Sequence, residues 1–183
     1  MKNNEELEEV FVNKLVGNLN KYFKVEKEVW SDCRQGRIDL VITTDEGYRF
    51  GVECKQNNDK RGEEIGEFIK QAIRYKDYKF NGVRIPIFIA PPLSYNYFIM
   101  NQQEQILEGK KWHKDRHIET HEHHTVNGFL GSFGVGEIRK CNSFFFLSFS
   151  NKIIWSSQKQ YNTGIARGTH EANYQKLLLK LDI

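Results

Sequence analysis

Two stretches of the chain decide its fold: GRIDLVI at residues 36–42 and YRFGVECK at residues 48–55. Each mixes polar and apolar side chains with a period close to two, which predicts a β-strand. Glu53 and Lys55 lie two positions apart and therefore share one strand face. If the two strands pair as a hairpin, Asp39 joins Glu53 and Lys55 on one polar surface above an apolar floor.

These residue types suit the metal-assisted hydrolysis of phosphodiester bonds. Carboxylate oxygens such as those of Asp39 and Glu53 bind hard divalent cations. The cation stabilises the charge that builds on the phosphate and lowers the pKa of a bound water. The plainer alternative is a solvated hairpin face whose charges pair at the surface. The strand context and the upstream aspartate favour a metal site over a solvated face.

The spacing Asp-x13-Glu-x-Lys in two adjacent strands resembles the PD-(D/E)XK nuclease superfamily. Ile38 stands where the family name has proline. The resemblance implies an α/β fold with a restriction-endonuclease-like core, α-β-β-β-α-β, in which helices flank a mixed central sheet. It also implies that Asp39, Glu53 and the backbone carbonyl of Cys54 bind Mg²⁺ or Mn²⁺. Lys55 would then position the attacking water and steady the scissile phosphate.

A helix is predicted from Gly62 to Phe80, because its apolar side chains recur at helical spacing. Gln71 and Tyr75 lie four positions apart and share one face of this helix. They resemble the Gln-x-x-x-Tyr motif of the RecB-type exonuclease branch, which implies that Gln71 orients the catalytic groups and Tyr75 contacts nucleic acid. Arg37 and Arg74 are weaker candidates for strand contact. The alternative for Gln71 is a polar position at the edge of an amphipathic helix.

A first helix is predicted at about Asn4–Tyr22, with an acidic first turn that suits the helix dipole. Glu8 precedes apolar residues by three and seven positions. This spacing resembles Holliday-junction-resolvase-like members of the superfamily, and it implies that Glu8 extends the metal site or supports a second ion. Glu9 and Glu5 are substitutes. All three acids also suit a helix N-terminus without any catalytic role.

We expect a single domain: a core at about 1–92, a His-rich insertion at about 93–127 and a β-rich part at about 128–183. Four glycines in the segment 127–136 predict tight turns or close backbone approach. The remaining elements form an antiparallel β elaboration and a closing helix. The elaboration has strands at Glu137–Lys140, Ser143–Ser150 and Ile153–Ser156, and the last helix lies at about Thr169–Leu181. The core ends with a buried strand at Val83–Ala90, and a short helix at about Tyr95–Glu108 follows it.

Histidines are concentrated in the middle of the chain, where five of the six lie between positions 113 and 124. In a helix, His113, His117 and His121 would line one face, and imidazoles at that spacing can bind zinc. The segment is very polar, so the alternatives are an ordinary loop or a nucleic-acid contact that becomes charged below pH ~6.5. We therefore expect a loop or a nucleic-acid contact in this segment rather than a zinc site.

Composition limits the possible partners and compartments. The formal net charge of +3 is compatible with a polyanionic partner without identifying one. The three cysteines show no paired spacing, which indicates a reducing, cytoplasmic location. Three cysteines cannot hold a four-cysteine iron–sulfur cluster, so we expect none. No apolar run approaches the ~20 residues of a membrane span, so we expect no membrane partner and no signal peptide.

Taken together, these residues predict a divalent-metal-dependent nuclease that acts on DNA. One alternative is a structure-specific or restriction-type endonuclease that acts as a homodimer, because symmetric cuts usually need symmetric subunits. The other is a non-catalytic nucleic-acid-binding or interaction protein that uses the His-rich and Gly-rich half. Cleavage polarity, strand form and sequence preference do not follow from the sequence.

Overall fold

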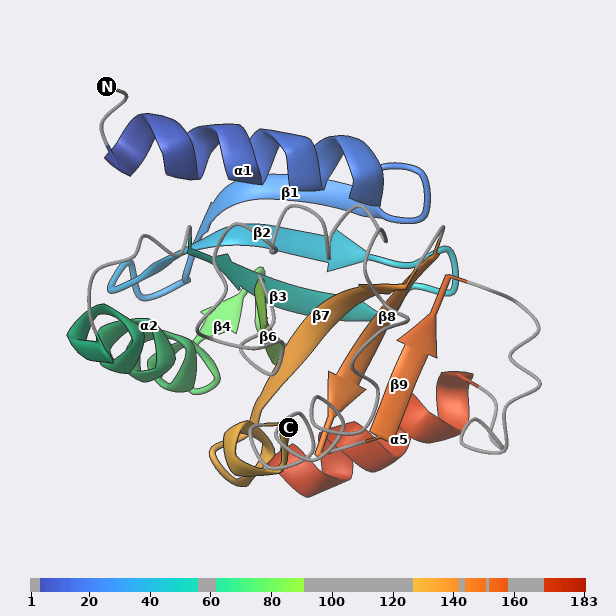
Figure 1. Ribbon diagram of the computed structural model, residues 1–183. Helices are drawn as coiled ribbons and strands as arrows, with labels where there is room; N and C mark the ends of the chain where they lie inside the picture. Colours follow the sequence, from blue (N-terminus) through green and yellow to red (C-terminus); the bar gives the residue numbers. More distant parts are fainter. Residues whose placement is uncertain (1–3, 56–61, 91–126, 142–143, 151, 158–169) are drawn as a thin grey trace, which may run out of the picture. The chain divides into compact units, whose positions relative to one another are not determined.

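The computed structural model describes residues 4–55, 62–90, 127–141, 144–150, 152–157 and 170–183 (Figure 1). Side chains are described within these ranges except at residues 4–8, 62–65, 140–141, 144 and 170. The fold is mixed α/β, with mostly antiparallel strand pairing. The chain divides into two compact units, Met1–Ile89 and Ala90–Ile183. The expected division into one domain with an insertion stays a prediction.

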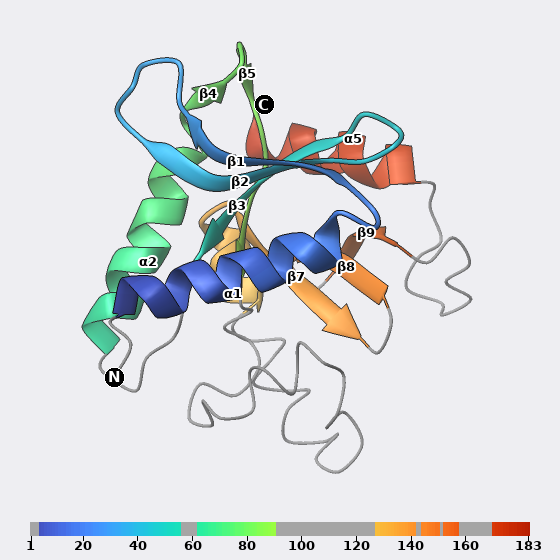
Figure 2. The same ribbon diagram turned by 90° about the horizontal axis from the view of Figure 1, so that it is seen from above.

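The first unit follows the order predicted from the sequence, with one addition. Its elements through β6 are α1 (Asn4–Leu19), β1 (Lys24–Trp30), β2 (Arg37–Thr43), β3 (Arg49–Cys54), α2 (Gly62–Tyr75), β4 (Lys79–Phe80), β5 (Val83–Arg84) and β6 (Ile87–Ala90). The strand order is β1-β2-β3-β6, and β1, β2 and β3 pair antiparallel (Figure 2). The added feature is the separate antiparallel pair β4–β5.

The core of the first unit lies on the apolar face of the β2–β3 hairpin. Ile38, Leu40 and Ile42 alternate along β2 and are fully buried. On β3 the ring of Phe50 meets Phe88 of β6 edge to face, with 5.5 Å between the ring centroids. Helix α1 packs against β1 and buries Leu19 completely. The polar residues of β2 and β3 are therefore carried on rigid strands.

Two predicted boundaries in this unit were wrong, and both have a local cause. The second helix ends at Tyr75 rather than Phe80, because Asn81 and Gly82 form the two-residue turn between β4 and β5. Their φ angles of 53° and 82° are both positive, which a twisted two-residue hairpin requires. The predicted strand Val83–Ala90 is interrupted before Pro86, which has no N–H for a ladder.

The second unit contains the predicted antiparallel strands and closing helix: β7 (Val135–Cys141), β8 (Phe144–Phe149), β9 (Lys152–Ser156) and α5 (His170–Leu181). The strand order is β7-β8-β9, and α5 packs against β9. The glycine-rich segment differs in part from its prediction. Residues 127–132 are helical, and a turn through Gly134 at φ 80° leads into β7. The predicted helix at 95–108 lies outside the described residues.

A buried polar network holds this unit together. The carboxylate of Glu137 accepts hydrogen bonds from Arg139 Nη2 at 2.7 Å and from Asn127 Nδ2 at 2.9 Å. The Ser148 hydroxyl donates to Asn127 Oδ1 at 3.2 Å. All four side chains are buried. Because buried charges are tolerated only when they are paired, the network fixes the helical residues 127–132 against β7 and β8.

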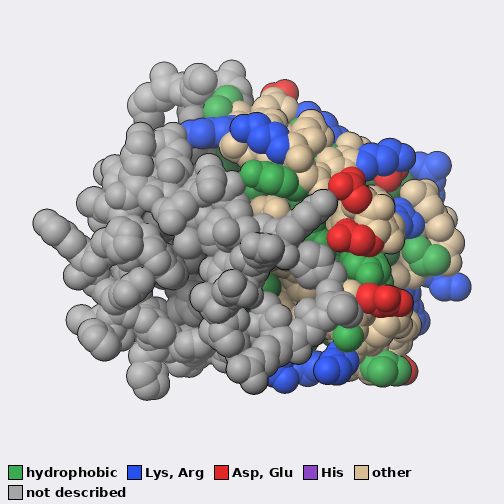
Figure 3. Space-filling model, turned by 90° about the vertical axis from the view of Figure 1, so that its right-hand side faces the viewer, with side chains coloured by type: hydrophobic (Ala, Val, Ile, Leu, Met, Phe, Trp, Pro, Cys, Tyr) green, Lys and Arg blue, Asp and Glu red, His purple; other side chains and the backbone are tan. Residues whose placement is uncertain are grey.

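The molecular surface bears on possible partners. On the described part of the face in Figure 3, basic and acidic side chains are interspersed among hydrophobic ones. Within the described ranges, no helix is both long and apolar enough to span a membrane.

Candidate functional site

The β2–β3 hairpin brings the two predicted metal-binding carboxylates to neighbouring positions. Its register pairs Leu40 with Val52 and Thr43 with Arg49. Continued by one position, this register sets Asp39 opposite Glu53. Directly opposed residues of an antiparallel pair point to the same face. The predicted convergence of the two acids therefore agrees with the strand register.

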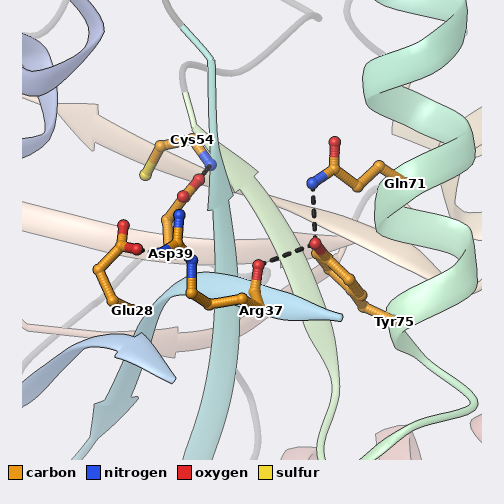
Figure 4. Close-up of polar contacts among 6 residues, drawn as sticks. All are labelled: Glu28, Arg37, Asp39, Cys54, Gln71 and Tyr75. Atoms are coloured by element: carbon orange, nitrogen blue, oxygen red, sulfur yellow. Dashed lines mark hydrogen bonds and ion pairs between the residues drawn. The ribbon is translucent and has the colours of Figure 1, made fainter. Parts of the chain in front are cut away.

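A hydrogen bond fixes Asp39 at this end of the hairpin. Its Oδ2 accepts from the backbone N–H of Cys54 at 2.6 Å (Figure 4). The carboxylate thus lies at the peptide bond that joins Glu53 to Cys54. The Asp39 side chain thus satisfies a backbone N–H just beyond the Leu40–Val52 pair, the last pair of the β2–β3 ladder. An ionised carboxylate has about four lone-pair positions, and this hydrogen bond uses one of them.

Burial differs between the three predicted catalytic residues. Glu53 is only 4% exposed, whereas Asp39 is partly exposed and Lys55 is exposed where β3 ends. A buried carboxylate beside a second carboxylate is an arrangement that a cation stabilises. The exposed lysine lies two residues from Glu53 and so extends the same strand face toward solvent. The predicted cation site at Asp39 and Glu53 would therefore have one side open toward solvent.

One hydrogen bond from Tyr75 joins helix α2 to β2, and a second, within α2, supports it. The Tyr75 hydroxyl donates to the backbone carbonyl of Arg37 at 2.8 Å and accepts from Gln71 Nε2 at 2.8 Å (Figure 4). Burial raises the pKa of Tyr75, the Gln71 hydrogen bond lowers it, and the charges of Glu53 and Asp39 raise it further. Both carboxylates are thus close enough to act on this hydroxyl. The catalytic roles that the motif implies for Gln71 and Tyr75 stay predictions.

The residues expected to contact nucleic acid are Tyr75, Arg37 and Arg74. Tyr75 is only 5% exposed, and its ring packs near Tyr78 and Phe80, so its contact with nucleic acid stays a prediction. The Arg37 Nε pairs with Glu28 Oε2 at 2.7 Å, with both side chains about half exposed. Arg74 is exposed on the last turn of α2.

Several predicted residues lie outside what is described. The side chains of Glu5 and Glu8 belong to this group, and so do His113, His117 and His121 as whole residues. The substitute Glu9 is exposed on α1. The side chain of Cys54 is buried, while metal binding by its carbonyl stays a prediction.

Two residues of the β1–β2 loop support the site and were not singled out from the sequence. Ser31 and Gly36 close the loop, since Ser31 N–H donates to the Gly36 carbonyl at 2.8 Å and Gly36 N–H donates to Ser31 Oγ at 3.1 Å. A Cβ added at Gly36 would lie 2.6 Å from Tyr75 Cε1. Glycine therefore lets α2 approach the start of β2. A glycine directly before a predicted strand was the available signal.

The donor set fits Mg²⁺ or Mn²⁺ better than a softer metal. Within the described ranges, no group of three or more His, Cys, Asp or Glu side chains is arranged around a common metal position. Asp39 and Glu53 instead supply two carboxylates. Mg²⁺ is commonly held by one or two carboxylates and keeps several waters, so this pair meets its requirement.

Comparison with known proteins adds no relative. No family model matches the chain, and neither a curated protein nor a solved structure matches it. Function is therefore inferred from the chemistry of these residues and from the resemblance of their pattern.

Proposed function

We propose that this chain is a divalent-metal-dependent nuclease that hydrolyses phosphodiester bonds, with DNA as its substrate and Mg²⁺ or Mn²⁺ as its metal. The observation that carries the proposal is the 2.6 Å hydrogen bond from the Cys54 N–H to Asp39. It fixes one carboxylate at the peptide of the other, on the strand face that leads to Lys55.

In this proposal some residues bind the metal or the phosphate, and others position the residues that do so. Asp39 and Glu53 would hold the metal, which supplies charge stabilisation at the phosphate and a bound water of lowered pKa. The exposed ammonium of Lys55 steadies the scissile phosphate and orients the attacking water. Gln71 and Tyr75 are positioning residues, because Tyr75 acts on β2 through the carbonyl of Arg37.

The order of elements supports a restriction-endonuclease-like core as part of this proposal. Without the β4–β5 pair, the first unit runs α-β-β-β-α-β. The candidate carboxylates lie on its second and third strands, and the Gln-x-x-x-Tyr pair lies on the helix that follows them. This is where the superfamily resemblance requires each of them.

The test is a cleavage assay on purified protein. Labelled single-stranded, linear double-stranded and closed circular DNA are incubated with Mg²⁺, Mn²⁺ or EDTA. Lys55→Ala is compared with Lys24→Ala, an exposed lysine at the far end of β1. We expect metal-dependent cutting that falls about 100-fold or more in Lys55→Ala and is unchanged in Lys24→Ala.

The same assay separates the alternatives. Cutting of the closed circle by a stable dimer selects the restriction-type or structure-specific endonuclease. If folded protein binds DNA but cuts none of the substrates with either metal, the nuclease proposal fails and the non-catalytic binding protein replaces it. Equal cutting by Lys55→Ala and the wild type would also refute the assigned role of Lys55.

A further inference from the structure

Trp30, at the end of β1, is an exposed indole with cationic neighbours. It is 46% exposed. The guanidinium carbons of Arg34 and Arg37 lie 6.0 Å and 5.7 Å from the centre of its ring. A single exposed apolar side chain is ordinary on a protein surface. An exposed tryptophan between arginines is the combination that binds nucleic-acid bases and phosphates. We call Trp30, Arg34 and Arg37 the Trp30 platform.

The Trp30 platform shares the strand face of the candidate carboxylates. Trp30 is paired with Arg37 across the β1–β2 ladder, so both point to one face. Asp39 lies two residues further along β2 on that face. Strand geometry puts the Cα atoms of Trp30 and Asp39 about 8 Å apart, from ~3.4 Å per residue and ~4.8 Å between strands. The indole is therefore within reach of a nucleotide that borders the cleaved bond.

The loop that carries the platform is anchored at both ends. Besides the bonds that join Ser31 to Gly36, Asp32 accepts from the backbone N–H groups of Asn81 and Gly82 at 3.0 Å and 2.8 Å. Arg34 within the loop has a φ of 58°, a backbone conformation that non-glycine residues adopt at some energetic cost. An anchored loop presents the indole with little ordering left to lose on binding.

A second set of charges adjoins this loop. Lys79 and Arg84 are directly opposed in the β4–β5 pair, and both are exposed. Like charges in opposed positions destabilise a strand pair. A polyanion bound there would offset this repulsion. Because Asp32 accepts from the turn of the same pair, this strand pair is attached to the loop that connects Trp30 to Arg37.

We infer that the Trp30 platform stacks an unpaired base of single-stranded nucleic acid, next to the phosphate at the metal that Asp39 and Glu53 would hold. This inference rests on the proposed function and specifies its substrate as single-stranded. The base stacks on the indole and displaces the exposed Arg34, which then pairs with a phosphate. Arg37 stays paired with Glu28. In a duplex the faces of the bases are already covered by their neighbours, so the platform selects unpaired bases.

The test is equilibrium binding in EDTA, which does not depend on hydrolysis. Fluorescence anisotropy measures the affinity for a labelled oligothymidylate, for a duplex of equal length and for an oligomer of equal charge that lacks bases. Trp30→Ala and Trp30→Phe are compared with Val83→Ala, whose parent side chain is equally exposed at 46%. Thermal unfolding confirms that each variant is folded.

We expect Trp30→Ala to weaken oligothymidylate binding by about 5- to 150-fold, since stacking contributes about 1–3 kcal/mol per base. Trp30→Phe retains most of the affinity, and Val83→Ala retains all of it. Wild-type protein binds the baseless oligomer as weakly as Trp30→Ala binds oligothymidylate. The comparison of oligothymidylate with the baseless oligomer on wild-type protein, where we expect the same 5- to 150-fold difference, requires no variant to fold.

Two results would overturn the inference: unchanged oligothymidylate affinity in Trp30→Ala, or an equal loss for oligothymidylate and duplex. Failure of the nuclease proposal is visible separately. Binding that depends on Trp30 without any metal-dependent cutting would remove the nuclease and leave the platform. Metal-dependent cutting together with binding that does not depend on Trp30 would remove the platform and leave the nuclease.

Discussion

Replacing Gly36 with alanine tests the contact between the start of β2 and helix α2. The added Cβ would lie 2.6 Å from Tyr75 Cε1 and 2.7 Å from Tyr78 Cε2. Favourable contacts between carbon atoms fall at about 3.5–4.0 Å. Each contact is therefore about 1 Å too short, and two rings must give way at once. Tyr75 is buried and held by two hydrogen bonds, so it cannot move without breaking them.

The expected loss of stability follows from these distances. Overpacking of this kind lowers the free energy of unfolding by about 1–3 kcal/mol. Alanine also restricts the unfolded chain more than glycine does, which raises the free energy of unfolding by about 0.4–1 kcal/mol. We therefore expect the Gly36→Ala variant to lose about 1–2 kcal/mol of unfolding free energy, which lowers Tm by about 2–8 °C. Metal-dependent cutting should fall as well, because a displaced Tyr75 releases the carbonyl of Arg37.

The chain supplies matched controls for this substitution. Gly17 in α1 and Gly66 in α2 have no atom within 4 Å of an added Cβ. Alanine is favoured over glycine inside a helix by about 1 kcal/mol, so Gly17→Ala and Gly66→Ala should raise Tm. Thermal unfolding followed by circular dichroism measures all three variants. A Gly36→Ala variant as stable as the wild type would show that the contact between the loop and α2 is not as close as described.

Two further predictions concern the carboxylates and the tyrosine. Asp39→Asn keeps an oxygen that can accept from the Cys54 N–H, so the stability of the metal-free protein should change by less than about 1 kcal/mol. The rise in Tm that Mn²⁺ produces should be lost in this variant. An undiminished Mn²⁺ response in differential scanning fluorimetry would remove Asp39 from the metal site. The pKa of Tyr75 is raised in the folded protein, so its contribution to stability is complete below the unfolded value of about 10 and is lost as pH rises through the folded value. Tyr75→Phe should therefore show a shallower alkaline loss of stability than the wild type in urea unfolding above pH ~10, and equal slopes would contradict the burial of this hydroxyl.

The elements that carry the site could be predicted because their signals are local. Strands β2 and β3 alternate apolar and polar residues, and their register follows from burying one face. Helix α2 has apolar residues at helical spacing. By contrast, β1 was assigned no residue range, because none of its side chains is fully buried and its alternation is weak. An edge strand of this kind gains its structure from pairing with β2 rather than from its own pattern.

The parts that the sequence did not yield depend on contacts between distant residues. The end of α2 was placed five residues too late, although Asn81-Gly82 is a strong hairpin signal that could have corrected it. The hydrogen bond between Asp39 and the Cys54 N–H depends on how two strands separate at one end. Likewise, the requirement for glycine at position 36 arises only once the ring of Tyr75 packs above it.

The arrangement also explains how α2 can influence the carboxylates without supplying a metal ligand. Strand β2 is tied at two points within three residues: Tyr75 holds the carbonyl of Arg37, and the N–H of Cys54 holds the carboxylate of Asp39. One hydrogen bond joins β2 to α2, and the other joins β2 to β3. Asp39 is thereby oriented before any cation arrives, and little reorganisation remains for the bound state. Gln71 acts one step further away, since it bonds the Tyr75 hydroxyl that makes the first tie. Under the proposed function, a Gln and a Tyr four residues apart on one helix would therefore position a site on the adjacent hairpin.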